Sequence, residues 1–340
     1  MFKKFLILVL VTMFLGTLML TNGVAKEGPF VIGLSNFSLG NSWRVQMVEE
    51  ARYAASAIYG DLVEELIVTE AEEDISKQIS DIEDLIVREV DAILITAASP
   101  QALIPVVNKA MAAGIVVVDF DNLVYTDNVT AHVIVDQKEF GRVQADWLSE
   151  KIGGEGQIIA FNGMKGTAIS AERFEGAKNV FDQYPGIEIV QEVHADWDYA
   201  KAKRAMEALL IAYPGIDGVW SQGGAMSEAV VEAYLERGKE PPPVTGEDGN
   251  GFLKIWAELR DGDYPEFDSI ATSMPTWCSV EAMDVALKAL TNQPFEHETY
   301  IPIPTITSDN LYEYVKPDLP NSYWCNSKLP EEVVKQIFER

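Results

Sequence analysis

The residues best placed for chemistry lie at the end of a buried apolar run, GIVVVDFDN over residues 114–122. An unbroken apolar run of this length is typical of a strand that is buried on both faces of a parallel sheet. In open α/β sheets, ligands bind in the crevice beyond the carboxyl ends of the strands. At that edge, Asp119 and Asp121 would accept hydrogen bonds from hydroxyl groups, and Phe120 would offer a stacking face. The run therefore predicts a ligand site, although Asp121 and Asn122 are also residue types that commonly begin a turn.

Strand and helix patterns alternate on both sides of this run, from Pro29 to Leu290. Repeated strand–helix units of this length indicate parallel sheets with right-handed crossovers. The units are too many for one sheet, and Gly153-Gly154 near the middle fits a break between two similar lobes. The sequence therefore predicts an α/β fold of two doubly wound lobes. The expected strands are 30–36, 61–69, 91–96, 115–119, 131–135, 157–161, 187–194, 218–221, 242–246 and 269–273, and the expected helices are 43–59, 75–86, 100–113, 138–152, 168–183, 199–213, 225–237, 251–260 and 276–290.

The expected helix over 138–152 has apolar residues that predict its buried face, namely Phe140, Val143 and Trp147. The pattern changes after residue 291, because residues 292–330 are rich in Pro, Tyr and Asn and show little periodicity. We expect this tail to wrap the surface before a last short helix, 331–339.

The first 25 residues have the features of a secretory signal peptide. Two lysines precede an apolar run from Phe5 to Leu20, and the small residues Gly23-Val24-Ala25 predict cleavage after Ala25. The alternative is a membrane anchor, because the apolar run is near the lower limit of length for a membrane span. The small residues before the cleavage position favour removal.

The composition excludes several classes of partner and site. Acidic residues number 53 against 26 basic ones, a net charge of −27, which repels phosphate backbones and anionic lipid and disfavours an anionic ligand. We therefore expect no nucleic-acid partner. Cys278 and Cys325 cannot form a disulfide framework, although an exported protein could contain one bond between them. With three scattered histidines we expect no zinc site, no other metal and no cofactor.

Several segments together resemble the periplasmic sugar-binding proteins of ABC transporters, of the ribose/galactose type within the type I periplasmic binding protein family. The resemblance covers the mature chain and depends on the order and spacing of its motifs. These are the signal peptide, IGLSNFSLGNSWR near the start, GIVVVDFDN, GTAISAERFEGAK, HADWD and VTGEDGNG.

The resemblance implies two Rossmann-like lobes with parallel sheets, joined by a three-strand hinge and closing on one monosaccharide, which would be a pentose, a hexose or a polyol. The implied boundaries are 26–135 plus 274–304 for the N-terminal lobe and 136–273 plus 305–340 for the C-terminal lobe. The implied partner is the membrane permease of an ABC transporter, with a chemoreceptor as a further candidate. We expect a monomer located in the periplasm.

The resemblance also implies which residues of the first lobe contact the sugar. Trp43 and Arg44 fall where ribose-type proteins have two aromatic residues, and Thr96 falls where they have Asn. Asp119 matches their strand-end Asp, but Phe120 replaces the Arg that normally follows it. Because that Asp–Arg pair usually grips ring hydroxyls, Arg44 is our candidate to supply the missing guanidinium.

In the second lobe, Arg173 matches a sugar-contacting Arg, Trp197 an aromatic stacking residue and Asp248 an Asp of the family, with Glu247 in place of its aromatic neighbour. Gln222 and the two glycines after it fall where an Asn and an Asp are expected. A second group of candidates is less direct: Ser273 falls where Gln is usual, and Gln137 lies beside the first crossover, where hinge or capping roles are equally open. With so many contacts changed, we expect a ligand other than ribose.

The same residues leave other functions open. A secreted glycosidase would need two carboxyl groups across the scissile bond, for which Asp119 with Asp121 or Glu247 with Asp248 are candidates. An amino acid or a furanose signalling molecule is the main alternative ligand for the same fold. A transcription regulator with these lobes is excluded, because it would need an N-terminal helix-turn-helix and a basic face. The sequence has no GxSxG, Walker or HExxH motif, so we predict a binding protein and not an enzyme.

Overall fold

The structure, a computed structural model, describes residues 28–338. The predicted signal peptide lies outside the described residues. Within residues 28–338, no helix combines the length and apolar character needed to cross a membrane.

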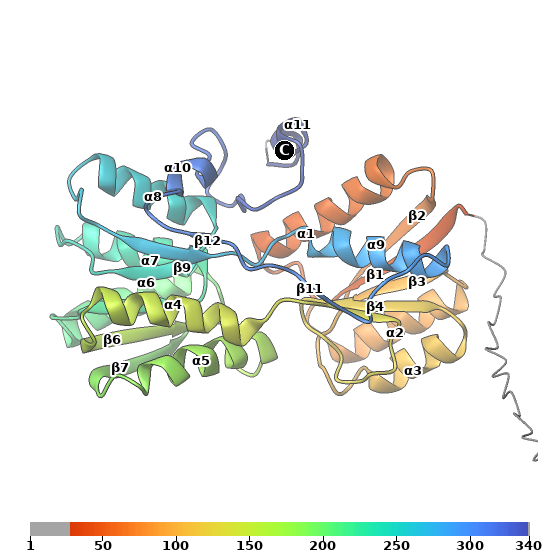
Figure 1. Cartoon of the computed structure of the whole chain (residues 1–340), viewed down its shortest axis with the longest axis horizontal. Coiled ribbons are helices and arrows are strands. Elements are labelled where there is room, and N and C mark those ends of the chain that lie inside the picture. Colours follow the sequence, from red (N-terminus) through yellow and green to blue (C-terminus); the bar gives the residue numbers. More distant parts are fainter. Residues whose placement is uncertain (1–27, 339–340) are drawn as a thin grey trace, which may run out of the picture.

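Residues 28–338 fold into two sheets of six strands, each flanked by helices (Figure 1). The strand order is β11-β5-β4-β3-β1-β2 in the first sheet and β12-β10-β9-β8-β6-β7 in the second. Neighbouring strands are parallel, except for the antiparallel pair β10–β12. The first sheet contains β1 (Phe30–Asn36), β2 (Val63–Glu70), β3 (Ala92–Thr96), β4 (Val116–Phe120), β5 (Ala131–Ile134) and β11 (Glu298–Tyr300), and the second contains β6 (Glu155–Asn162), β7 (Gly186–His194), β8 (Gly218–Ser221), β9 (Val244–Glu247), β10 (Ser269–Thr272) and β12 (Thr305–Ile306).

Helices cover both faces of each sheet, as the continuous apolar strands require. In Figure 1, α9 is blue yet lies among the red and orange elements of the first lobe. The first lobe contains α1 (Ser42–Tyr53), its π-helical continuation η1 (Ala54–Ile58), α2 (Ile75–Val87), α3 (Ile104–Ala112) and α9 (Cys278–Leu290). The second contains α4 (Gln137–Lys151), α5 (Ala168–Phe181), α6 (Tyr199–Ala212), α7 (Gly224–Leu235) and α8 (Asn250–Asp261), with α10 (Leu311–Tyr314) and α11 (Glu331–Phe338) in the tail.

The chain passes between the two lobes three times. It crosses at residues 135–136, because β5 belongs to the first sheet while α4 packs against α5 and the second sheet. It returns at 273–277 between β10 and α9, and crosses again at 301–304 between β11 and β12. The predicted fold of two doubly wound lobes with a three-strand hinge is confirmed.

Local signals explain where several elements begin and end. The Asn41 side chain accepts a hydrogen bond from the Arg44 backbone N–H at 3.0 Å and so caps α1. Gly114 has a φ of +82°, the left-handed conformation that ends α3 and lets the chain turn directly into β4. From β1 to α9 the strands and helices agree with the predicted ranges apart from shifts at their ends, the largest at the start of α3. Three short elements of the tail, β11, β12 and α10, were not predicted.

The predicted buried face of α4 was partly wrong. Phe140, Gln144 and Leu148 are buried, whereas Val143 and Trp147 are half-buried. The buried residues are spaced four apart, so they share one face of the helix. Gln144 can lie on that face because its amide nitrogen donates hydrogen bonds to the Gly246 carbonyl and the Thr272 hydroxyl, which satisfy this nitrogen inside the lobe.

The tail does more than wrap the surface. Apolar side chains of residues 306–334, including Ile306, Leu311 and Val315, lie in the same hydrophobic core as α7 and α8. The tail therefore belongs structurally to the second lobe, a role that its weak periodicity did not indicate.

Candidate ligand-binding cleft

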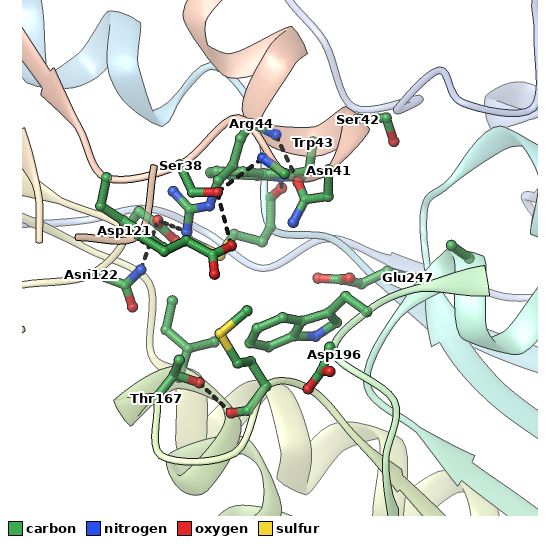
Figure 2. Close-up of a pocket in the computed structure, with 18 of the residues that line it drawn as sticks. Ser38, Asn41, Ser42, Trp43, Arg44, Asp121, Asn122, Thr167, Asp196 and Glu247 are labelled. Carbon is green, nitrogen blue, oxygen red and sulfur yellow. Dashed lines mark hydrogen bonds and ion pairs between the residues drawn. The ribbon is translucent and has the colours of Figure 1, made fainter. Parts of the chain in front are cut away.

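A concave cleft lies between the lobes, and such a position between two domains is typical of small-molecule sites. Its walls are the segments that follow the carboxyl ends of strands in both sheets. Figure 2 shows Arg44 and Asp121 facing Thr167, Asp196 and Glu247 across this space. The first lobe contributes Phe37, Ser38, Asn41, Trp43, Arg44, Glu73, Asp121 and Asn122, and the second contributes Met164, Thr167, Ile169, Arg173, Asp196, Trp197 and Glu247.

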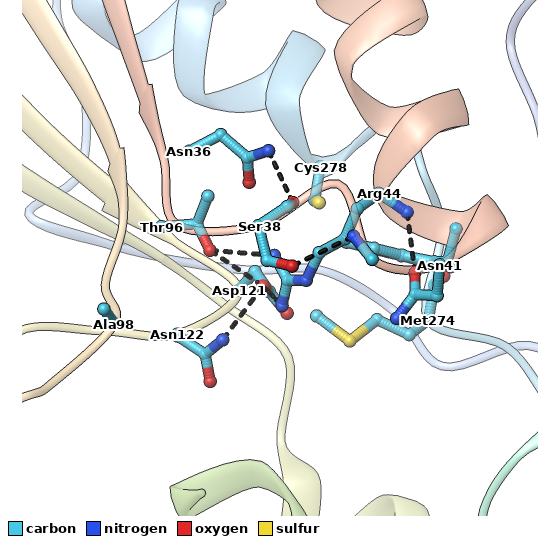
Figure 3. Close-up of polar contacts among 12 residues, drawn as sticks. Asn36, Ser38, Asn41, Arg44, Thr96, Ala98, Asp121, Asn122, Met274 and Cys278 are labelled. Atoms are coloured by element: carbon cyan, nitrogen blue, oxygen red, sulfur yellow. Dashed lines mark hydrogen bonds and ion pairs between the residues drawn. The ribbon is translucent and has the colours of Figure 1, made fainter. Parts of the chain in front are cut away.

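Arg44 and Asp121 form the charged centre of the first-lobe wall (Figure 3). The Arg44 guanidinium donates to Asp121 Oδ2 at 2.7 Å and to Thr96 Oγ1 at 3.1 Å, and it lies 3.9 Å from the centre of the Phe37 ring. Thr96 and Asn122 also donate to Oδ2 of Asp121. Since no hydrogen bond from the described residues ends on Oδ1, that oxygen remains able to accept one from a ligand.

Arg173 and Glu247 form the charged centre of the second-lobe wall. Its Nη1 donates to Glu247 Oε1 at 2.8 Å and to the Gln222 carbonyl at 2.9 Å, and its Nε donates to Gln137 Oε1 at 2.8 Å. The guanidinium lies 3.6 Å from the centre of the Phe140 ring. Arg173 is 2% exposed, so these partners fix its orientation and its charge is compensated within the protein.

Two glycines place Arg173 beside the first residues of α4. A Cβ atom on Gly141 would lie 1.8 Å from the Arg173 carbonyl oxygen, and one on Gly176 would lie 2.0 Å from that of Lys138. The glycines therefore let α4 and α5 approach backbone to backbone. This close approach is what brings the α5 guanidinium within reach of Gln137.

Two tryptophans add apolar surface to opposite walls. The Trp43 indole N–H donates to the Met274 carbonyl at 2.7 Å, which fixes its ring against the hinge. Trp197 lies between two glycines, since a Cβ atom on Gly163 would lie 2.1 Å from its ring and one on Gly223 2.7 Å. Its indole N–H is buried and has no hydrogen-bond partner among residues 28–338. An unpaired buried donor in a cleft is a natural contact for a ligand oxygen.

Four residues of the cleft adopt the left-handed backbone conformation that non-glycine residues rarely adopt. The φ angles are +66° for Glu73, +60° for Asp121, +55° for Asp196 and +55° for Trp197. Such conformations cost about 1–3 kcal/mol each and concentrate at functional sites. The strain therefore supports a functional reading of this cleft, independently of its shape.

Burial changes the acid–base behaviour of the two acids at the end of β9, Glu247 and Asp248. Desolvation raises the pKa of Glu247, and the charge of Arg173 beside it opposes this shift. Desolvation also raises the pKa of Asp248 to about 7, against the lowering effect of the Asn326 backbone N–H that donates to it.

Six of the thirteen candidate residues line the cleft, and three more bond the two arginines among those six. Thr96, Gln137 and Gln222 do not line the cleft but bond the two arginines that do. The six lining residues are Trp43, Arg44, Asp121, Arg173, Trp197 and Glu247.

The remaining four candidates lie outside the cleft wall. Asp119 is fully buried, where it accepts from the Val124 N–H at 2.7 Å and pairs with His132 Nδ1 at 2.5 Å. Phe120 is fully buried in the first-lobe core. The strand-end acid of the cleft is thus Asp121, because the left-handed turn after β4 directs the chain back across the sheet edge.

Asp248 and Ser273 form a buried layer behind the cleft. Both bond the tail residue Asn326, whose backbone N–H donates to Asp248 and whose side-chain amide donates to Ser273. Their role in the structure is therefore to hold the tail. Neither side chain lines the cleft.

Sequence reasoning missed more than half of the cleft wall. Several missed residues lie two or three positions after the end of a strand, such as Ser38 after β1, Glu73 after β2, Met164 after β6 and Asp196 after β7. The rule that ligands lie beyond the carboxyl ends of parallel strands could have identified these segments. It could not have identified Trp324, which comes from the tail.

The two cysteines remain separate in the structure. Cys278 and Cys325 are both free and buried, and burial raises the pKa of each thiol well above its ordinary value. The bond that an exported protein could contain is therefore not formed in this structure.

Comparisons with known proteins agree with this architecture. Residues 32–294 match the family described as the periplasmic binding protein domain. The ribose import binding protein of Bacillus subtilis is 32% identical over 233 residues, which are 67% of this chain and 72% of that protein. The xylitol-binding protein of Mycolicibacterium smegmatis is 27% identical over 253 residues, 73% of this chain and 70% of that protein.

Two solved structures extend the comparison to three dimensions. An ABC transporter solute binding protein from Thermobispora bispora superposes with a TM-score of 0.78 at 28% identity, covering 91% of this chain and 95% of that one. One from Bacillus halodurans with bound myo-inositol gives a TM-score of 0.75 at 25% identity, covering 85% and 98%. The chain therefore belongs to the periplasmic binding protein family.

Proposed function

We propose that the protein captures a monosaccharide, whether a pentose, a hexose or a polyol, between its two lobes and delivers it to the permease of an ABC transporter. The observation that carries this proposal is the meeting of the Arg44–Asp121 and Arg173–Glu247 pairs in one cleft. Relatives that bind ribose or xylitol, and a neighbour with bound myo-inositol, support the class of ligand.

The chemistry of the cleft suits a polyhydroxy ligand. Sugar hydroxyls both donate and accept, and the cleft offers carboxylate acceptors, amide groups and the unpaired indole N–H of Trp197. Hydrogen bonds to charged groups contribute roughly 1.5–3 kcal/mol each. Four or five of them contribute roughly 6–15 kcal/mol in total, which at the upper end exceeds the ~8 kcal/mol of micromolar binding and offsets the entropy of capture.

Capture requires closure of the lobes about the three crossings. We place the lobe boundaries at residues 135/136, 273/274 and 304/305, within those crossings. The ligand must bind the closed arrangement better than an open one, because it can shift the equilibrium only by that difference in affinity. Walls from both lobes satisfy this condition, since a sugar touches both sets of side chains only when the lobes are together.

Two alternatives have less support. A carboxylate ligand such as an amino acid would need a free guanidinium, but Arg44 and Arg173 are each paired with a carboxylate of the protein at 2.7 and 2.8 Å.

A glycosidase would need two carboxyl groups facing the scissile bond. Asp119 and Asp248 are both buried outside the cleft wall, so neither predicted pair has two cleft-facing members. We therefore propose a protein without catalytic activity.

The remaining parts of the proposal concern the cell. We propose export with cleavage after Ala25, a periplasmic location and a monomeric protein that docks on the permease in its closed form. A chemoreceptor is a further candidate partner. Relatives named as import binding proteins support the permease as the first of these partners.

Titration calorimetry of the mature protein against ribose, allose, xylitol, myo-inositol and arabinose, with pyranose- and furanose-fixed methyl glycosides, tests the proposal. We expect one ligand class to bind at a ratio of one per chain. The matched variants are Trp197→Ala, which should abolish that binding, and Trp147→Ala, a tryptophan of α4 that does not line the cleft. Silence of the wild-type protein across the panel would overturn the sugar assignment.

A further inference from the structure

The C-terminal tail contacts both lobes, although it emerges from the second. Residues 321–328, which we call the strap, run beside the segment after β9. There the Asn250 N–H donates to the Tyr323 carbonyl at 2.8 Å and the Cys325 N–H donates to the Asp248 carbonyl at 3.0 Å. Figure 1 shows the tail passing from α10 back toward α1 before α11. These backbone bonds attach the strap firmly to the second lobe.

The opposite edge of the strap bonds a polar stripe on α1 of the first lobe. Ser42, Gln46 and Glu50 are spaced four apart, so they share one helix face. The Trp324 indole N–H donates to Ser42 Oγ at 3.0 Å, and the Ser327 hydroxyl donates to Glu50 at 2.5 Å. Gln46 and Glu50 are fully buried. Buried polar groups need partners, and the strap supplies them together with Thr276 of the second crossing, which accepts from Gln46 Nε2 and donates to Glu50 Oε1, both at 3.1 Å.

Gln46 holds the backbone of Trp324 on both sides. Its Oε1 accepts from the Trp324 N–H at 2.9 Å, and its Nε2 donates to the Trp324 carbonyl at 2.9 Å. One side chain therefore pairs with this residue as a neighbouring strand would. Trp324 lines the cleft and is 8% exposed.

The strap is also bonded to the second crossing. Asn326 donates to Ser273 Oγ at 3.0 Å and accepts from the Trp277 indole N–H at 3.2 Å. The Lys328 ammonium lies 3.7 Å from the centre of the Trp277 ring. The position of the strap is thus coupled to the segment that must rotate when the lobes move.

We propose that the strap is a fourth tie between the lobes, and that it places Trp324 against the bound sugar as a contact that neither α/β lobe supplies. The sugar contact rests on the proposed function, whereas the tie does not. Gln46 is the positioning residue for Trp324. The Trp324 indole would stack on the apolar C–H face of the sugar ring.

Fluorine NMR of protein labelled with 5-fluorotryptophan tests the sugar contact, with Trp324→Phe assigning the resonance of Trp324. We expect sugar to shift this resonance together with that of Trp197 and to leave that of Trp147 unmoved. Trp324→Ala should weaken sugar affinity at least tenfold, and Trp324→Phe, which keeps a stacking ring, should weaken it less. A Trp324 resonance that stays fixed while that of Trp197 shifts, with an affinity within twofold of wild type, would overturn the contact.

The positioning role has its own variants. Gln46→Ala removes both bonds to Trp324, and Gln46→Glu retains the acceptor, so we expect a several-fold loss of affinity in the first and partial rescue in the second. The Trp324 resonance should broaden in Gln46→Ala before any sugar is added. Equal affinity of both variants and wild type would refute the role.

The tie is measured without sugar, which separates it from the proposed function. Spin labels at Val87 of α2 and Ile211 of α6, both at least 77% exposed, report the distance between the lobes by pulsed electron resonance. We expect Gln46→Ala to widen the distance distribution in ligand-free protein. An unchanged distribution overturns the tie whether or not a sugar binds. If no tryptophan resonance responds to any sugar, the proposed function fails instead.

Discussion

Replacing Arg173 by Met should destabilise the protein in a way that depends on Glu247. The two side chains are 3% and 6% exposed and their charged atoms are 2.8 Å apart. Removal of one partner of a buried pair leaves the other charge without compensation, which typically costs about 3–5 kcal/mol. Replacement of both partners by uncharged residues of similar size is often close to neutral. Arg173→Met should therefore be far less stable than the double variant Arg173→Met/Glu247→Gln.

The pH dependence of the single variant follows from the same pair. In wild type, Arg173 opposes the rise that burial causes in the pKa of Glu247. Without Arg173 this pKa must rise further, and a raised pKa in the folded state stabilises folding at low pH and loses that contribution as the pH rises. The loss in Arg173→Met should thus be smaller at pH 5 than at pH 8.

Thermal unfolding at several pH values measures both effects. For a lobe of this size, 3–5 kcal/mol corresponds to a fall in midpoint of roughly 6–20 °C. Lys178→Met is the matched control, because Lys178 lies on the same helix and pairs with Asp182 at the surface, where ion pairs contribute roughly 0–1 kcal/mol. The reasoning is refuted if the double variant loses the sum of the two single effects, or if the single variant is equally unstable at both pH values.

Three further predictions address the cleft and the acid behind it. Gly163→Ala would place a Cβ atom 2.1 Å from the Trp197 ring, so calorimetry should record at least a tenfold loss of sugar affinity, whereas Gly215→Ala, with nothing within 4 Å, should bind as wild type does. The lysine of Arg44→Lys cannot reproduce the planar guanidinium that bonds Thr96 and Asp121 at once. We expect calorimetry to measure about a tenfold lower sugar affinity for this variant, and an affinity equal to that of wild type would contradict the prediction. Burial raises the pKa of Asp248 to about 7 from 3.8. The stabilisation from its protonated form is therefore complete below about pH 4 and is lost as the pH rises through 7. The free energy of unfolding should fall by at most about 4 kcal/mol over this range. The thermal unfolding midpoint of Asp248→Asn should therefore fall less between pH 4 and 8 than that of wild type. If both midpoints change equally with pH, Asp248 is not the source of the pH dependence.

The order of the elements was readable from the sequence because it depends on local patterns. The apolar run of β4 predicts a strand covered on both faces, and the expected helices 43–59 and 100–113 correspond to α1 with η1 and to α3. Trp43, Arg44, Arg173 and Trp197 were identified through resemblance, and all four line the cleft. Trp43, Arg44 and Trp197 are close to the end of a strand or the start of a helix, which is where the fold class places ligands, whereas Arg173 lies in the second turn of α5.

Interactions between distant segments decided the rest. Periodicity could not choose between Asp119 and Asp121, because the choice depends on a left-handed turn and on a His132 that approaches from the neighbouring strand. It could not give Asp121 its partner either, because Arg44 is 77 residues away.

The sequence by itself determined the two-lobed fold, the acidic surface and the order of the strands and helices from β1 to α9, since these follow from composition and from spacing along the chain. Tertiary structure alone decided that Gln46 holds the tail and that Trp324 faces the cleft. The physical reason is that the hydrogen-bond partner of a buried amide is defined only when both segments are folded against each other. Gln46 and Trp324 are 278 positions apart in the sequence.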